Sequence, residues 1–150
     1  MRVDFYQLSR DPVEVMLPRI AERALQAGER LLVVSGDDEQ LGRIGAGLWG
    51  RIADSFLAHG LAGGAYDARQ PILLSGALQP ANGARFLAIA DGVWRDEIFA
   101  DDGSEFARVF YVFGDTTLQP ARDCWRMLGQ REGIDRRFWK QQGGKWVEGP

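Results

Sequence analysis

Short apolar runs and longer stretches with helical spacing follow one another along this chain. Residues 2–8 (RVDFYQL) predict a strand, and residues 30–36 (RLLVVSG) form an apolar run without alternation, which is typical of a strand covered on both faces. Between them, apolar side chains at helical spacing predict a helix that ends near Gly28. Strand, helix and buried strand make a βαβ unit, whose crossover is right-handed in nearly all proteins.

The start of this first helix carries two signals. Asp11 is a predicted N-cap, with Pro12 at the first helical position and Glu14 three residues after the cap. Pro18 either kinks the helix or marks where it truly begins, because proline lacks the backbone N–H that a helix interior needs. The pattern leaves both possibilities open.

The remaining elements complete an α/β pattern. Residues 37–60 predict a second helix, 116–133 a third, and 71–76, 85–92 and 108–114 further strands. The gap between the first two of these strands is short for a covering helix, which leaves an antiparallel arrangement of that pair open. Residues 138–147 predict a hairpin around Gly143 and Gly144. We predict a single three-layer α/β/α domain over residues 1–150, with a mixed, mostly parallel central sheet, Rossmann-like without a nucleotide-binding loop.

Composition narrows the class of protein. The chain has 150 residues, 45% of them hydrophobic, one cysteine and one histidine. A disulfide within one chain and an ordinary zinc or iron site are therefore excluded, and we expect no metal and no cofactor. No apolar run reaches the length of a membrane span, and the first residues do not form a signal peptide, so a cytoplasmic protein without membrane contact is expected.

Charge is distributed unevenly along the sequence. The formal net charge is −3, which argues against nonspecific binding of nucleic acid. Residues 91–105 are strongly acidic, whereas residues 117–150 carry five arginines and two lysines. A basic C-terminal third on an acidic protein indicates an acidic partner of limited size; a solvated basic face is the alternative.

Two motifs resemble catalytic signatures but lack the required context. Residues 45–50 (GAGLWG) spell the dinucleotide fingerprint, yet they lie inside a stretch with helical spacing instead of in the turn after a strand. Asp54, Ser55 and His59 contain the residue types of a hydrolase triad. Ser55 has no glycine-flanked elbow, which argues against a triad. We expect His59 either to cap the end of the second helix or to hydrogen-bond to backbone.

Two groups of residues suit protein docking. Trp49 and Phe56 are seven residues apart, hence on nearly the same side if the helix continues that far, and they are either core or an aromatic anchor for a partner. On the last helix, Leu118, Ala121, Cys124 and Leu128 form the predicted core stripe. Trp125 lies at the edge of this stripe, with Arg122 and Arg126 beyond it. A ring beside two guanidinium groups suits an apolar side chain next to a carboxylate, and a solvated basic edge is the alternative.

With these residues in view, nearly the whole chain resembles the chi subunit family of bacterial DNA polymerase III holoenzyme. The resemblance rests on DFYQL, LLVVSGDDEQ, LW followed by DSFLAHGL, RFLAIADG and the ending FWKQQGGKWV. Ala58 departs from the family, in which proline is commoner before the histidine. At the positions of Trp125 and Arg126 the family more typically has tyrosine and lysine.

The resemblance implies a non-catalytic subunit with two protein partners. The family's chi subunit joins the psi subunit of the clamp loader and binds the acidic C-terminal tail of single-stranded DNA-binding protein. It implies that Trp49 and Phe56 contact psi, and that Phe113, Arg122, Trp125 and Arg126 form the tail pocket. Nucleic acid would then be reached only indirectly.

Two other functions remain as alternatives. One is a nucleotide-dependent enzyme with a Rossmann-like fold. The other is a direct single-strand nucleic-acid binder, because residues 136–146 (RRFWKQQGGKW) interleave positive charge with aromatic rings.

Overall fold

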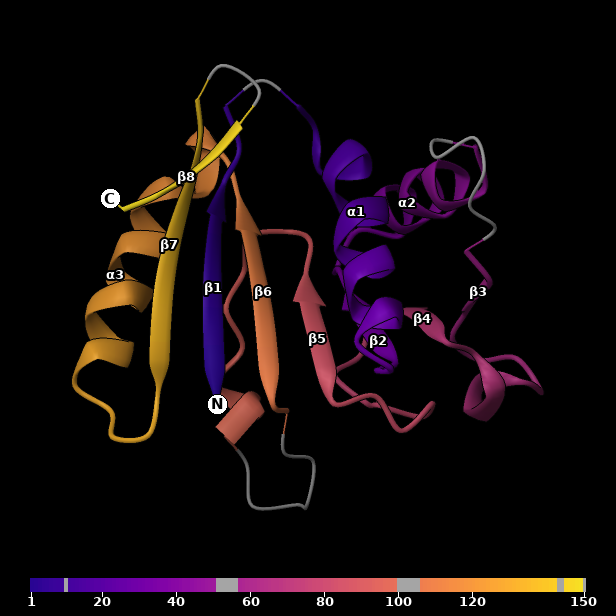
Figure 1. Cartoon of the computed structure of the whole chain (residues 1–150). Coiled ribbons are helices and arrows are strands. Elements are labelled where there is room, and N and C mark those ends of the chain that lie inside the picture. Colours follow the sequence, from indigo (N-terminus) through magenta and orange to yellow (C-terminus); the bar gives the residue numbers. More distant parts are fainter. Residues whose placement is uncertain (10, 51–56, 100–105, 143–144, 150) are drawn as a thin grey trace.

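The computed structural model describes residues 1–9, 11–50, 57–99, 106–142 and 145–149 (Figure 1). Within these ranges the helices and strands are β1 (Arg2–Gln7), α1 (Val13–Gln26), β2 (Leu31–Val34), α2 (Asp38–Gly50), β3 (His59–Leu61), β4 (Ile72–Ser75), β5 (Phe86–Ile89), β6 (Arg108–Phe113), α3 (Leu118–Gly129), β7 (Asp135–Gln142) and β8 (Lys145–Glu148). Three short 3₁₀ turns, η1 (Asp67–Arg69), η2 (Asp96–Phe99) and η3 (Asp115–Thr117), lie between them.

The eight strands of the described ranges form one sheet in the order β3-β4-β2-β5-β6-β1-β7-β8. Neighbouring strands are parallel throughout, except that β8 returns antiparallel to β7. The mixed, mostly parallel sheet and the hairpin of β7 with β8 confirm the prediction. β1 lies between β6 and β7, so the start of the chain is in the middle of the sheet.

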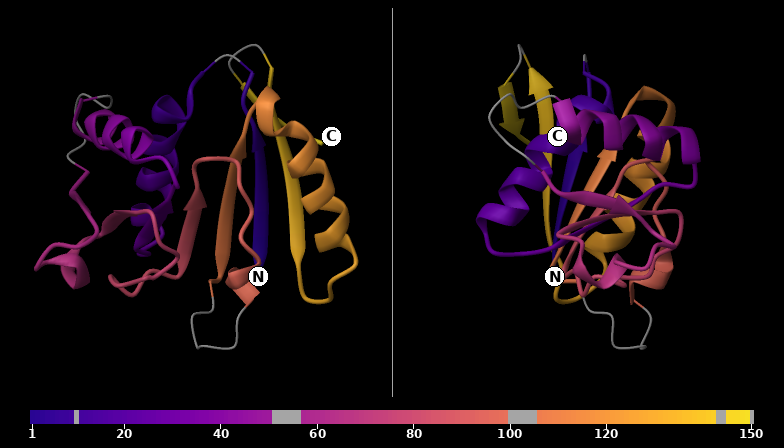
Figure 2. Two further views of the ribbon diagram at one scale, coloured as in Figure 1. Left: turned by 180° about the vertical axis from the view of Figure 1, so that it is seen from behind. Right: turned by 90° about the vertical axis from the view of Figure 1, so that its right-hand side faces the viewer.

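Helices cover both faces of the sheet (Figure 2). α1 and α2 pack against one cluster of sheet side chains, which includes Tyr6, and α3 packs against the other, which includes Phe5. Successive residues of a strand point to opposite faces, which places Phe5 and Tyr6 in different clusters. Because β2 is covered on both sides, all four of its residues are buried, as its continuous apolar run predicts.

The first helix settles one open question and corrects one prediction. α1 runs from Val13 to Gln26 with the buried Pro18 inside it, so Pro18 does not mark the beginning. The N-cap residue is Pro12, without a side-chain cap, and the N-cap prediction for Asp11 is wrong. Asp11 instead accepts a hydrogen bond of 2.7 Å from Nε2 of Gln141, which ties the loop before α1 to β7.

The relation of β4 to β5 is also decided. The two strands lie on either side of β2 and both are parallel to it, so the antiparallel alternative is wrong. The connecting residues 76–85 contain no helix. Asn82 holds this connection in place, because its side-chain amide donates to the carbonyls of Leu31 and Gln70 at 3.2 and 3.0 Å. None of the helices in the described ranges is both long and apolar enough to cross a membrane.

Candidate protein-docking sites

The outer edge of α3 carries the first candidate site. Ala121, Cys124 and Leu128 are buried against the sheet, whereas Arg122 and Arg126 are exposed. The half-buried Trp125 lies between the two surfaces. Leu118 is partly buried and packs against the same cluster. The predicted core stripe and its basic edge are therefore confirmed, and Arg122 and Arg126 lie one helical turn apart on α3.

Aromatic rings from two strands hold the Trp125 side chain. Phe5 of β1 meets it edge-to-face with 5.2 Å between the ring centroids and 83° between the planes. Phe138 of β7 does the same at 5.6 Å and 87°. Edge-to-face contacts of this kind are favourable beyond the area that they bury. The indole thus has a defined orientation at the edge of the core.

The two arginines differ in their surroundings. Nη1 of Arg126 is 3.6 Å from the carboxylate of Asp123, and both side chains are largely exposed, at 73% and 62%. Such a pair contributes little, so a stronger anion can compete for Arg126. Among the residues that the structure describes, Arg122 has no ion-pair partner.

Phe113 lies deeper than the other residues assigned to this site. It ends β6, is only 2% exposed and meets Phe138 edge-to-face at 5.7 Å. Phe138 in turn contacts Trp125. In this geometry Phe113 supports the ring cluster beneath Trp125, while Arg122, Trp125 and Arg126 reach the surface.

Arg136 is a member of this cluster that the sequence patterns did not reveal. It belongs to β7, and its guanidinium carbon lies 4.1 Å from the centroid of the Trp125 ring. The alternation of side chains along β7 could have predicted its place, because Arg136 and Phe138 are two residues apart and so share one face of the sheet. That face is the one covered by α3.

Trp49 forms the second candidate site. Near the C-terminal end of α2, its side chain is 60% exposed, so the alternative that it is a core residue is wrong. Its ring contacts His59 with centroids 5.3 Å apart and planes at 64°. Phe56 lies outside the described residues, as do Asp54 and Ser55.

The structure decides between the two roles expected for His59. It begins β3, which pairs with β4, so the helix-capping alternative is wrong. Its Nδ1 atom lies 2.9 Å from the carbonyl oxygen of Leu57, which confirms the expected hydrogen bond to backbone, and its ring packs beside Trp49. His59 therefore connects the edge of the sheet to the exposed tryptophan.

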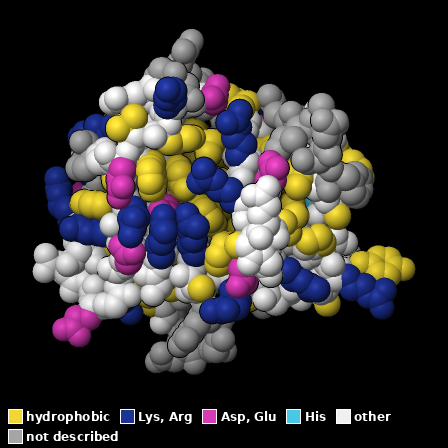
Figure 3. All heavy atoms as spheres, in the orientation of Figure 1, with side chains coloured by type: hydrophobic (Ala, Val, Ile, Leu, Met, Phe, Trp, Pro, Cys, Tyr) yellow, Lys and Arg dark blue, Asp and Glu magenta, His cyan; other side chains and the backbone are white. Residues whose placement is uncertain are grey.

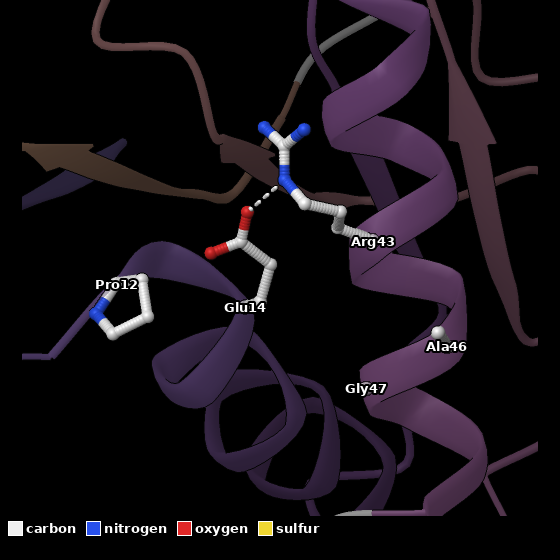
Figure 4. Close-up of a pocket in the computed structure, with 5 residues that line it drawn as sticks. All are labelled: Pro12, Glu14, Arg43, Ala46 and Gly47. Atoms are coloured by element: carbon white, nitrogen blue, oxygen red, sulfur yellow. Dashed lines mark hydrogen bonds and ion pairs between the residues drawn. The ribbon is translucent and has the colours of Figure 1, made fainter.

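A groove opens between the start of α1 and the middle of α2, with a volume of about 710 Å³ (Figure 4). Small residues, Ala46 and Gly47, line the α2 side, and Pro12 lines the α1 side. Nε of Arg43 donates to the Glu14 carboxylate at 2.8 Å and links the two helices across it. This ion pair joins the helices and offers no arrangement of nucleophile and base.

The geometry argues against a dinucleotide site. Gly45, Gly47 and Gly50 all lie within α2, so they do not form the turn between a strand and a helix N-terminus that the fingerprint requires. A hollow of about 270 Å³ does lie near the carboxyl ends of β5 and β6. Among the described residues, its lining includes the carboxylates of Glu14 and Asp91 but no lysine or arginine, which disfavours a phosphate.

The aromatic and basic C-terminal segment is engaged within the fold. Trp139 and Trp146 pack on Tyr6 with centroids 6.4 and 5.2 Å away. The ring planes of Tyr6 and Trp139 are 14° apart, so these two rings stack on one another. Lys and Arg side chains gather on this face (Figure 3), and Arg137 lies near the carboxylates of Asp135 and Glu148. These contacts favour a structural hairpin over a platform for bases.

The fold and these surfaces define an α/β protein whose exposed aromatic and guanidinium groups are suited to docking. Residues 1–136 match the family described as DNA polymerase III chi subunit, HolC. A relative in Escherichia coli (strain K12), DNA polymerase III subunit chi, is 28% identical over 131 residues, which cover 81% of this chain and 86% of the relative. The chain belongs to the DNA polymerase III chi subunit family, and its role is that of an accessory subunit in DNA replication.

Proposed function

We propose that this protein is a non-catalytic link between two partners in the cytoplasm. One partner is the psi subunit of the clamp loader, and the other is the acidic C-terminal tail of single-stranded DNA-binding protein. Membership of the chi family supports an accessory role in replication. The proposal treats residues 1–150 as one chi-like domain that works without a cofactor and reaches nucleic acid only through its partners.

The edge of α3 carries the tail-binding half of the proposal. Arg122 and Arg126 are exposed one turn apart, and Trp125 lies beside them at the edge of the core with its ring held by Phe5 and Phe138. A chain that ends in phenylalanine presents a carboxylate next to a phenyl ring. A guanidinium group can donate two parallel hydrogen bonds to one carboxylate, and the indole offers an apolar surface for the phenyl ring. Phe113 completes the site from beneath.

The exposed Trp49 carries the other half. A tryptophan with 60% of its surface exposed is a strong candidate for an interface anchor, since tryptophan is enriched among the residues that dominate binding energy. His59 packs against it and limits its motion. In the proposal Phe56 joins Trp49 in the contact with psi. Trp49 belongs to α2 and the tail site to α3, and these helices cover opposite faces of the sheet, so the proposal allows both partners to bind at once.

A peptide pull-down with the full chain tests the tail site. The bait is an immobilised acidic peptide that ends in phenylalanine, and the control bait is the same peptide without that residue. We expect retention on the first bait and loss on the second, because the site recognises the ring and the terminal carboxylate together. Equal retention on both baits would show that the interaction is only nonspecific charge attraction, and it would reject the proposed tail site.

A further inference from the structure

Arg136 reaches from β7 to α3 and contacts Trp125 twice. Its guanidinium lies over the indole ring with 4.1 Å between Cζ and the centroid, and Nη1 donates to the backbone carbonyl of the same residue. One side chain therefore holds both the ring and the backbone of Trp125. We propose that Arg136 is a positioning residue for the tail-binding site, an inference that rests on the function proposed for Trp125.

Gly129, at the end of α3, leaves the space that Arg136 occupies. A Cβ atom at this position would lie 2.8 Å from Cζ and Nη1 of Arg136, which is closer than such atoms approach in proteins. The backbone of Gly129 is not in the left-handed region, so its conformation does not require glycine. Glycine is a poorer helix former than alanine. The position of the Arg136 guanidinium gives a physical reason for this glycine.

The location of Arg136 suits a cation. It donates to a carbonyl in the C-terminal half of α3, where the helix dipole favours positive charge. In the sheet, Arg136 lies opposite Val3 of β1, and Phe138 lies opposite Phe5. Both β7 side chains therefore point to the face that α3 covers. Trp125 is thus enclosed by two rings and one guanidinium from β1 and β7.

This enclosure has a consequence for binding. A tryptophan that already has a fixed orientation loses less conformational freedom when a partner's ring packs on it. Arg136 also adds a guanidinium over the ring itself, next to the helix edge that carries Arg122 and Arg126. Displacing Arg136 therefore weakens tail binding even though the three predicted surface residues are unchanged.

Gly129→Ala is the decisive variant, because it adds one methyl group where the guanidinium lies. We expect the affinity of the full chain for the acidic, phenylalanine-terminated peptide to fall about three- to tenfold, as for the cost of ordering one side chain on binding. The melting temperature should not fall, since alanine favours the helix. Gly42→Ala in α2 is the matched control, because a Cβ there meets nothing within 4 Å, and it should leave the affinity unchanged.

Arg136→Leu and Arg136→Lys separate positioning from bulk charge. We expect Arg136→Leu to lower the peptide affinity as much as Gly129→Ala does, and Arg136→Lys to lower it less. The double variant Gly129→Ala with Arg136→Leu should lose no more affinity than either single variant. Incorporated 5-fluorotryptophan should show a shift of the Trp125 resonance, assigned with Trp125→Phe, in both Gly129→Ala and Arg136→Leu.

The outcomes distinguish this inference from the proposed function. If the wild-type chain does not bind the peptide, the tail site itself is wrong. If the wild-type chain binds and Gly129→Ala and Arg136→Leu bind equally well, the tail site stands and the role of Arg136 is rejected. Full recovery by Arg136→Lys would also reject it, because charge alone would then explain the effect.

Discussion

Nε of Arg108 donates to the carboxylate of Asp4 at 2.8 Å, and this carboxylate is completely buried. Arg2 and the Trp139 indole donate to the same carboxylate at 3.0 to 3.1 Å. Arg108 belongs to β6 and Trp139 to β7, so Asp4 connects β1 to both of its neighbours in the sheet. A buried charge with several donors is costly to leave unpaired, and this connection is therefore important for stability.

Asp4→Ala should lower the free energy of unfolding by about 1.5–3 kcal/mol, because the partly exposed Arg2 and Arg108 and the Trp139 indole lose a buried, charged acceptor. Urea denaturation followed by circular dichroism measures the change. Glu14→Gln, which removes the anion beside the half-exposed Arg43, is the control and should cost less than about 1 kcal/mol. Similar losses in both variants would contradict the role assigned to Asp4.

Arg122→Ala should weaken tail binding about tenfold or more, since a charge-assisted hydrogen bond contributes about 1.5–3 kcal/mol. The melting temperature should stay unchanged because the side chain is exposed. Calorimetric titration with the tail peptide measures the affinity. Arg69→Ala, which removes an exposed arginine near the opposite edge of the sheet, controls for net charge. An unchanged affinity in Arg122→Ala would reject the assignment.

Asp123→Asn should strengthen tail binding by up to about threefold, in keeping with the small energy of an exposed ion pair. The Asp123 carboxylate lies 3.6 Å from Arg126, competes for it and repels an acidic peptide. The substitution removes this negative charge. The gain should shrink as salt is added, because screening weakens exposed charges. Titrations at low and high ionic strength provide this comparison, and a loss of affinity would show that Asp123 itself helps to form the site.

Trp49→Ala should abolish co-purification with psi and leave tail binding and the melting temperature unchanged, because the side chain is mostly exposed. The preceding residue offers a contrast. Leu48 is 2% exposed, so Leu48→Ala should cost about 2–5 kcal/mol of stability. Co-expression with tagged psi and a thermal melt measure both effects. If Trp49→Ala also removed tail binding, a general loss of structure would be the explanation.

Alkaline pH should destabilise the fold, with Cys124 contributing. Burial raises the pKa of its thiol from 9.0 to about 12 and also raises the pKa of the Tyr111 hydroxyl. The native state therefore holds its proton where the unfolded state releases it, and the contribution of Cys124 is lost as pH rises from 9 toward 12. Melting temperatures across this range should fall less steeply for Cys124→Ala. An identical slope would contradict the contribution of the thiol.

Much of the fold follows from local sequence patterns, and the exceptions have identifiable causes. The apolar runs of β2 and β6 and the stripe on α3 were predictable because burial imposes a regular spacing. The parallel arrangement of β4 and β5 was not, because a helix is the usual parallel connection and this one relies on the Asn82 side chain instead. β3 was missed because a three-residue strand, His59–Leu61, has too few positions to show alternation.

The candidate site was predictable in part for the same reason. Arg122, Trp125 and Arg126 lie on one helix, so their spacing alone places them together. The contact between Arg136 and Trp125 depends on how β7 lies beside α3, and helical spacing carries no information about that arrangement. Phe113 is also placed by the sheet, which buries it among rings from β1 and β7.

The position of β1 inside the sheet, between β6 and β7, affects how the protein folds during its synthesis on the ribosome. β1 is synthesised early, yet its ion-pair partner Arg108 follows Asp4 by 104 residues, and Trp139 follows Asp4 by 135. Until β6 and β7 are made, β1 has no neighbouring strand on either side. Nascent β1 must therefore stay unpaired while most of the chain emerges, and such long-range pairing slows folding.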